Sequence, residues 1–370
     1  MSAFIRPDLQ EFSAYSSHAA AVEPKHADPI DQLDTNESAY DLPSPLKAKL
    51  AQEYQTSLAA NRYPDGEHGA LHRAIAAYVK TSAHLDAPAI TPEHITVGNG
   101  SDELIRSLLI ATCVGRAGSI LVAEPTFSMY KILAQTLGIE VVSVARDANT
   151  FALDLAATQT AIAQATTPIR MVFMVSPNSP TGNGLTAAEL TWLRSLPTDI
   201  LVVVDEAYFE FSQQTTLLDA LQRPNWVVTR TFSKAFRLAA HRVGYAIAAP
   251  TIIDVLEKVR LPYNLPSFSQ TAALLSLHHA PEILATIPEI QAERDRLITA
   301  LQALPNFQVW PSDANFIYCR PTIKSLTDVF TGLYQLGSRI RQTGGGLRIT
   351  IGTPAENNRT LAHLKTVIES

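Results

Sequence analysis

Short apolar runs alternate with helix-like segments along the first two thirds of the chain. The runs are rich in β-branched residues and apolar throughout, which is typical of strands that are buried on both faces of a sheet. They lie at residues 95–99, 119–125, 141–145, 169–177, 199–208 and 225–233. Segments with helical spacing of apolar residues separate most of them, and helical crossovers between such strands predict a mostly parallel sheet.

A different pattern follows Pro262, where helical segments are longer and apolar runs are shorter. Helices are expected at 268–278, 288–304 and 355–368, and strands at 307–310, 315–319 and 347–351. We therefore expect an α/β fold with a large domain at 46–262, whose mostly parallel sheet is covered by helices, and a smaller α+β domain at 263–370. Residues 1–45 are expected to form an N-terminal arm that joins the small domain. In such a sheet, the ligand site lies beyond the carboxyl ends of the strands.

The composition fits a globular protein with a large interior. The chain has 370 residues, more than the roughly 250–300 at which single cores stop growing. Hydrophobic residues make up 46% of it and charged residues 17%. The net charge is −6 and no basic run exceeds two residues, so nucleic-acid binding is not expected. No apolar stretch approaches the ~18–20 residues that cross a bilayer, so no membrane partner is expected either.

Cysteine usage and the N-terminal sequence bear on the compartment. Cys113 and Cys319 lie in apolar stretches without a CxxC partner. This pattern favours buried thiols in a reducing environment over a disulfide or zinc framework. The N-terminus has no basic segment followed by an apolar run, so export is disfavoured and a cytoplasmic location is expected.

Several familiar site signatures are missing. The segment 98–103 lacks the third glycine of the dinucleotide fingerprint, and the chain has neither a Gly-Lys pair for a phosphate loop nor a GxSxG elbow. His68 and His72 stand four residues apart, but Gly69 lies between them and no carboxylate follows at metalloprotease spacing. We expect a solvated helix face there and no metal site.

Lys234 and Asp205 are the most informative residues, because each follows an apolar run at the expected carboxyl end of a strand. Burial lowers the pKa of a lysine and frees its amine as a nucleophile toward carbonyl groups. Alternatively, such a lysine extends its amine into water and has no role in catalysis. Burial of the Asp205 carboxylate is unfavourable unless a cation meets it. That cation is either part of a ligand or an arginine, Arg230 or Arg242, in a structural salt bridge.

The remaining polar residues at strand ends point to anion binding. Gly100, Ser101 and Asp102 begin a helical segment after a strand, so backbone N–H groups and a positive helix end would face a phosphate. The Ser233 hydroxyl and the Arg242 guanidinium could complete the same pocket. A lysine, an aspartate and a phosphate cup at strand ends together fit pyridoxal phosphate.

Eight segments, in order, resemble one enzyme family. They are NRYPDG at 61–66, GNGSDELI at 98–105, PTFSMY at 125–130, PNSPTG at 177–182, DEAYFEF at 205–211, TFSKAFRLAAHRVGYAIA at 231–248, VRLPYNLPSFSQ at 259–270 and GLRITIGTP at 346–354. Together they closely resemble the histidinol-phosphate aminotransferases, which have the fold type I of pyridoxal-phosphate enzymes. The resemblance runs from about residue 34 to 354.

The resemblance implies a role for each matching residue. Lys234 would bind the cofactor covalently, Asp205 would pair with its pyridine nitrogen, and Tyr208 would hydrogen-bond its ring 3′-oxygen. Phe127 would stack on the ring, and Asn178 is a candidate for a second contact to the 3′-oxygen. The other implied cofactor-binding residues are Gly100, Ser101, Asp102, Thr231, Ser233, Arg242 and, from a second subunit, Tyr63. The implied substrate-binding residues are Tyr40, Arg341 and Arg348.

Some positions depart from the family pattern. Ser179 directly precedes Pro-Thr-Gly, where the family has the asparagine that contacts the 3′-oxygen, and the sequence leaves open whether Asn178 replaces it. Arg237 and His241 stand where the family has small residues, which adds a cation and bulk close to the cofactor. These departures concern the substrate pocket more than the cofactor.

The implied function is pyridoxal-phosphate-dependent transamination of histidinol phosphate, with glutamate and 2-oxoglutarate as the other pair, in histidine biosynthesis. The implied assembly is a homodimer. An aromatic-amino-acid aminotransferase and a phosphothreonine decarboxylase are alternatives with the same fold. From a different class, a non-catalytic sensor of pyridoxal phosphate is a further alternative, although roughly thirty N-terminal residues are too few for a DNA-binding domain of usual size.

Overall fold

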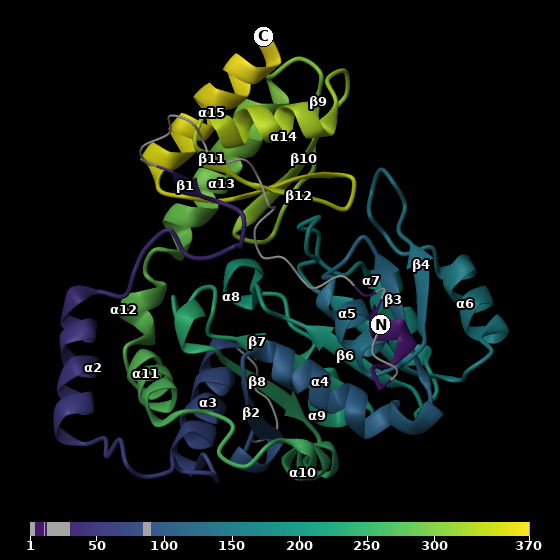
Figure 1. Cartoon of the computed structure of the whole chain (residues 1–370), viewed down its shortest axis with the longest axis vertical. Coiled ribbons are helices and arrows are strands. Elements are labelled where there is room, and N and C mark those ends of the chain that lie inside the picture. Colours follow the sequence, from purple (N-terminus) through teal and green to yellow (C-terminus); the bar gives the residue numbers. More distant parts are fainter. Residues whose placement is uncertain (1–3, 11, 13–29, 84–89, 370) are drawn as a thin grey trace.

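A sheet of seven strands forms the centre of the lower part of the molecule (Figure 1). The computed structural model describes residues 4–10, 12, 30–83 and 90–369. The strand order is β2 (Ile95–Asn99), β8 (Val243–Ala248), β7 (Trp226–Thr231), β6 (Leu201–Asp205), β5 (Ile169–Val175), β3 (Ser119–Glu124) and β4 (Val141–Ala145). All neighbours are parallel except β8, which is antiparallel to both β2 and β7.

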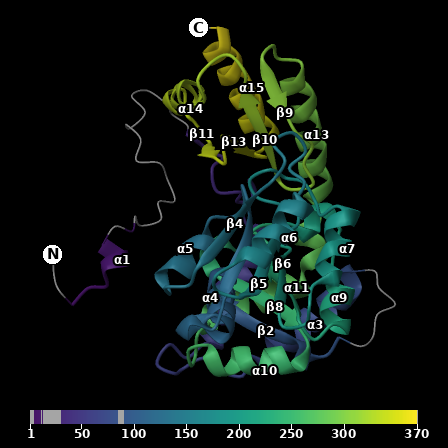
Figure 2. The same ribbon diagram turned by 90° about the vertical axis from the view of Figure 1, so that its right-hand side faces the viewer.

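Helices cover both faces of this sheet, which explains why its strands are apolar throughout (Figure 2). One face packs against α4 (Ser101–Thr112), α5 (Met129–Thr136) and α10 (Pro250–Val259). The other packs against α2 (Ser44–Thr56), α3 (Gly69–Ser82), α6 (Leu155–Gln164), α7 (Ala187–Ser195), α9 (Leu217–Gln222), α11 (Ser267–His278) and α12 (Ala280–Leu284). Within β6, Val203 faces the first core while Val202 and Val204 face the second, because side chains alternate along a strand.

A second, smaller sheet lies above the first (Figure 1). Its antiparallel order is β12 (Arg341–Thr343), β13 (Gly346–Thr350), β10 (Phe316–Pro321) and β9 (Phe307–Val309). It is accompanied by α13 (Ile287–Gln302), α14 (Leu326–Gln335) and α15 (Pro354–Glu369), which share its core. The N-terminal segment reaches the same region, where β1 (Asp31–Gln32) pairs in parallel with β11 (Ser338–Arg339). Two short helices complete the fold, α1 (Pro7–Gln10) and α8 (Phe209–Ser212).

The expected α/β class, with a mostly parallel sheet covered by helices, is confirmed. Strand β8 does not follow from the sequence pattern, because Gly244 interrupts its apolar run and glycine weakens a strand pattern. The structure explains this glycine, because a Cβ there would lie 2.5 Å from the backbone nitrogen of Ser101.

The three-part division at 1–45, 46–262 and 263–370 stays a prediction. Much of the expected N-terminal arm lies outside the described residues. Leu265, Ala273 and Ile283 belong to the core of the seven-stranded sheet, and α11 packs on α2 and α3. Packing in this region therefore favours a boundary close to the start of α13.

The expectation that His68 and His72 lie on a solvated helix face is wrong. His68 is fully buried and His72 is 9% exposed, with ring centroids 5.9 Å apart. Burial lowers the pKa of His72 to about 4. Among the described residues, no group of three or more His, Cys, Asp or Glu side chains is arranged to hold a metal ion.

Cys113 and Cys319 are both buried free thiols. Burial raises the pKa of Cys319 to about 12. No helix in the described part of the chain has the length and apolar character that a membrane span requires.

Candidate active site

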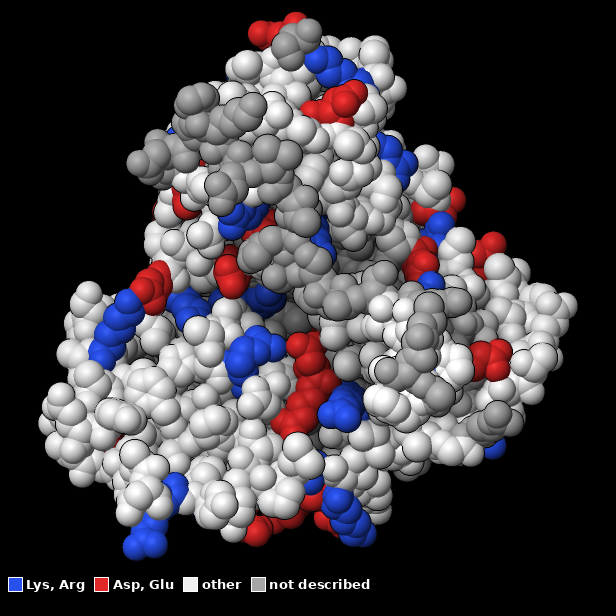
Figure 3. Space-filling view, in the orientation of Figure 1, with Lys and Arg blue, Asp and Glu red and all other residues white. Residues whose placement is uncertain are grey.

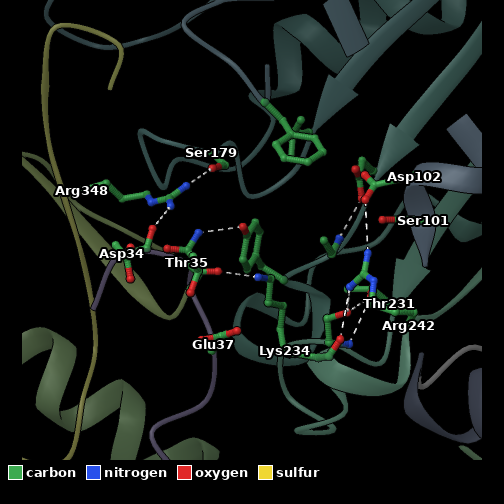
Figure 4. Close-up of a pocket in the computed structure, with 18 residues that line it drawn as sticks. Asp34, Thr35, Glu37, Ser101, Asp102, Ser179, Thr231, Lys234, Arg242 and Arg348 are labelled. Atoms are coloured by element: carbon green, nitrogen blue, oxygen red, sulfur yellow. Dashed lines mark hydrogen bonds and ion pairs between the residues drawn. The ribbon is translucent and has the colours of Figure 1, made fainter. Parts of the chain in front are cut away.

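A cavity of about 260 Å³ lies where the carboxyl ends of β5, β6 and β7 face the small sheet (Figure 4). Figure 3 shows acidic and basic side chains gathered around the hollow between the two parts of the molecule. The predicted site residues that line the cavity are Ser101, Asp102, Phe127, Asp205, Tyr208, Thr231, Ser233, Lys234, Arg242 and Arg348. These predicted residues are up to 247 positions apart in the sequence, from Ser101 to Arg348.

Lys234 lies at the floor of this cavity, just after β7. Its Nζ donates a 2.8 Å hydrogen bond to the backbone oxygen of Thr35, which belongs to the N-terminal segment. Burial lowers the pKa of Lys234 to about 8, and the charge of Arg348 acts in the same direction. With this pKa, about a tenth of the amine is neutral at pH 7, far more than for an exposed lysine, and the neutral amine can act as a nucleophile or a base.

Asp205, the last residue of β6, is buried and faces the same cavity. The hydroxyl of Tyr130 donates a 2.7 Å hydrogen bond to its Oδ2, and the backbone N–H of Ala207 donates to its Oδ1 at 3.2 Å. Burial raises the pKa of Asp205 to about 6, and the bond from Tyr130 opposes this rise.

The alternative in which Asp205 is a structural ion-pair partner of Arg230 or Arg242 is wrong. Arg230 binds Glu206 through two hydrogen bonds of 3.0 and 2.8 Å, with both side chains 1% exposed. Arg242 instead pairs with Asp102 at 3.2 Å. Among the described residues, no lysine or arginine forms an ion pair with Asp205. Its carboxylate therefore faces the cavity ready for a cation from a ligand.

The opposite end of the cavity forms a cup for an anion. Ser101 and Asp102 begin α4, a twelve-residue helix whose first backbone N–H groups have no partners within the helix. The Arg242 guanidinium also donates to the Ser233 hydroxyl at 3.4 Å, and the Ser233 hydroxyl accepts from Thr231 at 3.0 Å. Burial raises the pKa of Asp102, while Arg242 lowers it.

Gly100 does not line the cavity, but it sets the entry of the chain into α4. It adopts φ +74°, and a Cβ there would lie 2.6 Å from Nη2 of Arg242. Its N–H donates to the backbone oxygen of Arg242 at 2.8 Å. Because Gly100 has no side chain, the Arg242 guanidinium can approach the start of α4.

One end of the cavity is built around Arg348 on β13. Its Nη1 donates to the Ser179 hydroxyl at 3.0 Å and its Nη2 donates to the backbone oxygen of Asp34 at 2.6 Å. Arg341 on β12 is its direct cross-strand neighbour, although Arg341 does not line the cavity. Arg341 and Arg348 are thus paired residues on neighbouring strands of the small sheet.

Three other predicted residues lie outside the cavity. Asn178 is fully buried, and its amide donates to the backbone oxygen of Pro125 at 3.0 Å and to Thr181 at 2.6 Å. The Tyr40 hydroxyl donates to Glu289 at 2.7 Å. Tyr63 is 80% exposed. The sequence-based roles of these residues stay predictions.

Arg237 and His241 also point away from the cavity. The Arg237 guanidinium donates to the backbone oxygens of Asp41 and Ile283 at 2.9 and 2.7 Å. The His241 ring packs against Phe268, with centroids 5.4 Å apart. The sequence suggests that these residues add charge and bulk near the cofactor, but neither side chain lines the cavity.

Sequence reasoning missed several groups that line or support the cavity. They are Asp34, Thr35, Asn36 and Glu37 from the N-terminal segment, Ser179 from the loop after β5, and Tyr130 from α5. The rule that ligands bind beyond the carboxyl ends of parallel strands identifies neither residues of the N-terminal segment nor residues inside α5. Tyr130 and Ser179 lie within the family segments at 125–130 and 177–182, whereas none of the eight segments covers residues 34–37.

Comparison with known proteins gives one consistent family. Residues 30–364 match the family described as "Aminotransferase class I and II". "Histidinol-phosphate aminotransferase 2" of Nostoc sp. is 56% identical, covering 100% of this chain and 98% of that protein. "Histidinol-phosphate aminotransferase" of Thermosynechococcus vestitus is also 56% identical, covering 97% of this chain and 95% of that protein.

The fold agrees with a solved structure. The histidinol-phosphate aminotransferase from Sinorhizobium meliloti in complex with pyridoxal-5′-phosphate has a TM-score of 0.83 to this chain at 22% identity. The match covers 100% of this chain and 98% of that one. At this identity the likeness establishes the fold.

Proposed function

The chain belongs to the histidinol-phosphate aminotransferases, within class I and II of the aminotransferases, and we propose that it transfers an amino group from histidinol phosphate to 2-oxoglutarate. The return half-reaction uses the glutamate and 2-oxoglutarate pair, and the pathway is histidine biosynthesis. The observation that carries the proposal is the cavity in which Lys234, Asp205 and Arg348 converge.

The residues of the cavity fit pyridoxal 5′-phosphate, the cofactor of this family. Asp205 is a buried carboxylate that meets no cation among the described residues, as expected for the partner of a protonated pyridine nitrogen. The start of α4, Ser233 and Arg242 would hold the phosphate. Phe127 would lie against the ring, and the Lys234 amine would hold the aldehyde carbon.

When bound, pyridoxal phosphate supplies an electron sink for the charge left as a proton leaves the substrate carbon. The carboxylate of Asp205 keeps the ring nitrogen protonated and so favours that sink. Nζ of Lys234 would be the base that takes the proton from the substrate carbon. Its pKa of about 8 matches this task at neutral pH.

Arg348 is the proposed anchor for the anionic group of each substrate. Histidinol phosphate has a phosphate ester and no carboxylate, whereas glutamate carries carboxylates only. A guanidinium fits both anions because its N–H groups match phosphate and carboxylate geometry. Arg341, directly across β13, would add a second positive charge for the phosphate ester. Tyr40, on the N-terminal segment, is the candidate for closing over this end.

We also propose a homodimer in which Tyr63 reaches the partner's cofactor phosphate. Tyr63 stacks on Tyr263 with ring centroids 4.5 Å apart, and Tyr54 packs edge-on against Phe268 at 5.6 Å. These four aromatic residues are exposed by 37–80%. Exposed aromatic clusters of this kind are typical of protein interfaces.

A cytoplasmic location is part of the proposal, supported by the two buried free cysteines. The aromatic-amino-acid aminotransferase and phosphothreonine decarboxylase alternatives are not favoured, because the curated relatives at 48–56% identity over nearly the whole chain are histidinol-phosphate aminotransferases.

The test isolates the first half-reaction. The pyridoxal form is mixed with histidinol phosphate, phenylalanine, tyrosine or phosphothreonine, one at a time, without an acceptor. Conversion to the pyridoxamine form is measured as the loss of visible absorption. We expect histidinol phosphate to react fastest. Faster conversion by phenylalanine or tyrosine would overturn the substrate while leaving the aminotransferase class, and release of carbon dioxide from phosphothreonine would indicate a decarboxylase.

A further inference from the structure

Asn36 links the N-terminal segment, the large sheet and the small sheet at one point. It is 1% exposed, and its Nδ2 donates a 2.8 Å hydrogen bond to the hydroxyl oxygen of Tyr208. Tyr208 follows β6 and lines the cavity, whereas Asn36 comes from a segment 172 positions earlier.

The orientation of the Asn36 amide is fixed from its other side. Its Oδ1 accepts a 3.2 Å hydrogen bond from the Thr350 hydroxyl, and the same hydroxyl accepts the Asn36 backbone N–H at 3.0 Å. The Asn36 backbone oxygen accepts from Nδ2 of Asn315 at 3.1 Å. Because the amide oxygen faces a donor, the amide nitrogen faces Tyr208.

The direction of the Tyr208 hydrogen follows from this arrangement. A phenol oxygen that accepts a hydrogen bond from an amide does not donate back to that amide, so its own hydrogen turns elsewhere. The pKa of Tyr208 is raised by burial, while the charge of Arg348 and the hydrogen bonds with Asn36 and Ser179 lower it. The phenol therefore stays protonated, and its hydrogen is left for the Ser179 hydroxyl, which also lines the cavity, or for a ligand bound there.

We propose that Asn36 is a positioning residue that directs the Tyr208 hydroxyl toward the 3′-oxygen of bound pyridoxal phosphate. This inference rests on the proposed function. The backbone supports a dedicated role, since Asn36 has φ +55°, a left-handed conformation that asparagine adopts more readily than most residues. Asn178, the other candidate for a 3′-oxygen contact, has both amide hydrogens engaged by Pro125 and Thr181.

The proposal has a spectroscopic consequence. Negative charge on the 3′-oxygen holds a proton on the nitrogen that joins the cofactor to Lys234. A hydrogen bond from Tyr208 draws charge from that oxygen, so the proton leaves at lower pH. Weakening this donor raises the pH at which the visible absorption of the holoenzyme changes.

The test compares Asn36→Gly, Asn36→Asp and Tyr208→Phe as holoenzymes titrated between pH 5 and 10. Glycine removes the side chain while it tolerates the positive φ. Aspartate keeps the acceptor for Thr350 but offers Tyr208 an acceptor in place of a donor, which turns the phenol hydrogen away from the cavity. We expect Tyr208→Phe to raise the midpoint by about one unit, and both Asn36 variants to shift it in the same direction. In the Tyr208→Phe background, Asn36→Gly should cause no further shift.

A control separates positioning from stability. Asn225 is a buried asparagine, 7% exposed and remote from the cavity, whose Nδ2 donates to the backbone oxygen of Ile200 at 2.8 Å. Asn225→Ala should lower the melting temperature and leave the midpoint unchanged. A wild-type midpoint in Asn36→Gly and Asn36→Asp, or an added shift on top of Tyr208→Phe, would overturn the inference. If wild-type protein binds no pyridoxal phosphate, the proposed function fails first.

Discussion

The hydroxyl of Tyr130 donates a 2.7 Å hydrogen bond to Oδ2 of Asp205, and both side chains are buried. The Tyr130 ring is itself held by Phe173, stacked at 4.4 Å, and by Phe127, edge-on at 5.5 Å. One tyrosine therefore links the aromatic wall of the cavity to the carboxylate that would meet the pyridine nitrogen. It fixes the position of Asp205 without neutralising its charge.

Burial makes the Asp205 carboxylate destabilising in the protein without cofactor, although the hydrogen bond from Tyr130 offsets part of this effect. Its pKa is raised to about 6 from 3.8, so the native state binds more protons than the unfolded state between these values. Stability of the apoprotein should therefore fall as pH rises from about 4 to 6, and a shift of this size corresponds to roughly 3 kcal/mol. Asp205→Asn should abolish this pH dependence and raise apoprotein stability at pH 7 in denaturant titrations.

The same substitution should slow catalysis. Without the carboxylate the ring nitrogen loses its proton, and proton removal from the substrate carbon should slow on the order of 10²-fold or more, as for other lost electrostatic partners. Single-turnover absorption measurements give this rate, and cofactor affinity should change much less. Near-normal turnover in Asp205→Asn would show that Asp205 is structural.

The pKa of Lys234 predicts how the apoprotein takes up its cofactor. Only the neutral amine attacks the aldehyde, so the rate of covalent binding should rise about tenfold per pH unit and level off above pH 8. Borohydride reduction followed by peptide mapping should place the adduct on Lys234. Lys234→Ala should retain non-covalent binding through the anion cup and show no adduct, whereas Lys258→Ala, at an exposed lysine of α10, should behave as wild type.

The parts of the site that follow from local sequence are those at strand ends. Asp205 and Lys234 each end an apolar run, and buried parallel strands place such residues at one edge of the sheet. The contact between Asn36 and Thr350 could not be predicted from local sequence, because it spans 314 positions and depends on how the small sheet lies over the large one. Whether Arg230 pairs with Asp205 or with Glu206 also depends on packing. Successive side chains point to opposite sides of an extended chain, so only Glu206 faces Arg230.

The proposed dimer predicts complementation between two inactive variants. Lys234→Ala lacks the reactive amine, and Tyr63→Ala lacks the residue proposed to cross the interface. In a mixed dimer, one cavity combines an intact Lys234 with the partner subunit's Tyr63. Random mixing during refolding should restore up to about a quarter of wild-type activity, since half of the dimers would carry one intact site. Sedimentation should confirm dimers in each sample. Absence of any recovery would contradict a contribution of Tyr63 across the interface.

The two arginines of the small sheet predict how the enzyme distinguishes its substrates. Arg348 lines the cavity and Arg341 lies directly across the strand pair. Arg348→Ala should lower kcat/KM for both histidinol phosphate and glutamate, on the order of 10²-fold or more, because each loses a charge-assisted bidentate partner. Arg348→Lys should recover only part of this, since an ammonium lacks the planar fork.

Arg341→Ala should affect the two substrates unequally, and this inequality is a sharper test of the role of Arg341 than a loss of activity alone. A phosphate ester carries up to two negative charges at neutral pH, so a second nearby cation should benefit it more than it benefits a carboxylate. We expect Arg341→Ala to raise KM for histidinol phosphate about tenfold and KM for glutamate only slightly. High salt should reduce the difference, because the contribution of Arg341 acts through charge over a distance. Arg320→Ala, which removes a nearby arginine that stacks on Trp310 at 5.2 Å outside the cavity, is the matched control. An equal loss for both substrates in Arg341→Ala would assign Arg341 to the stability of the β12–β13 hairpin instead of to recognition of the phosphate ester.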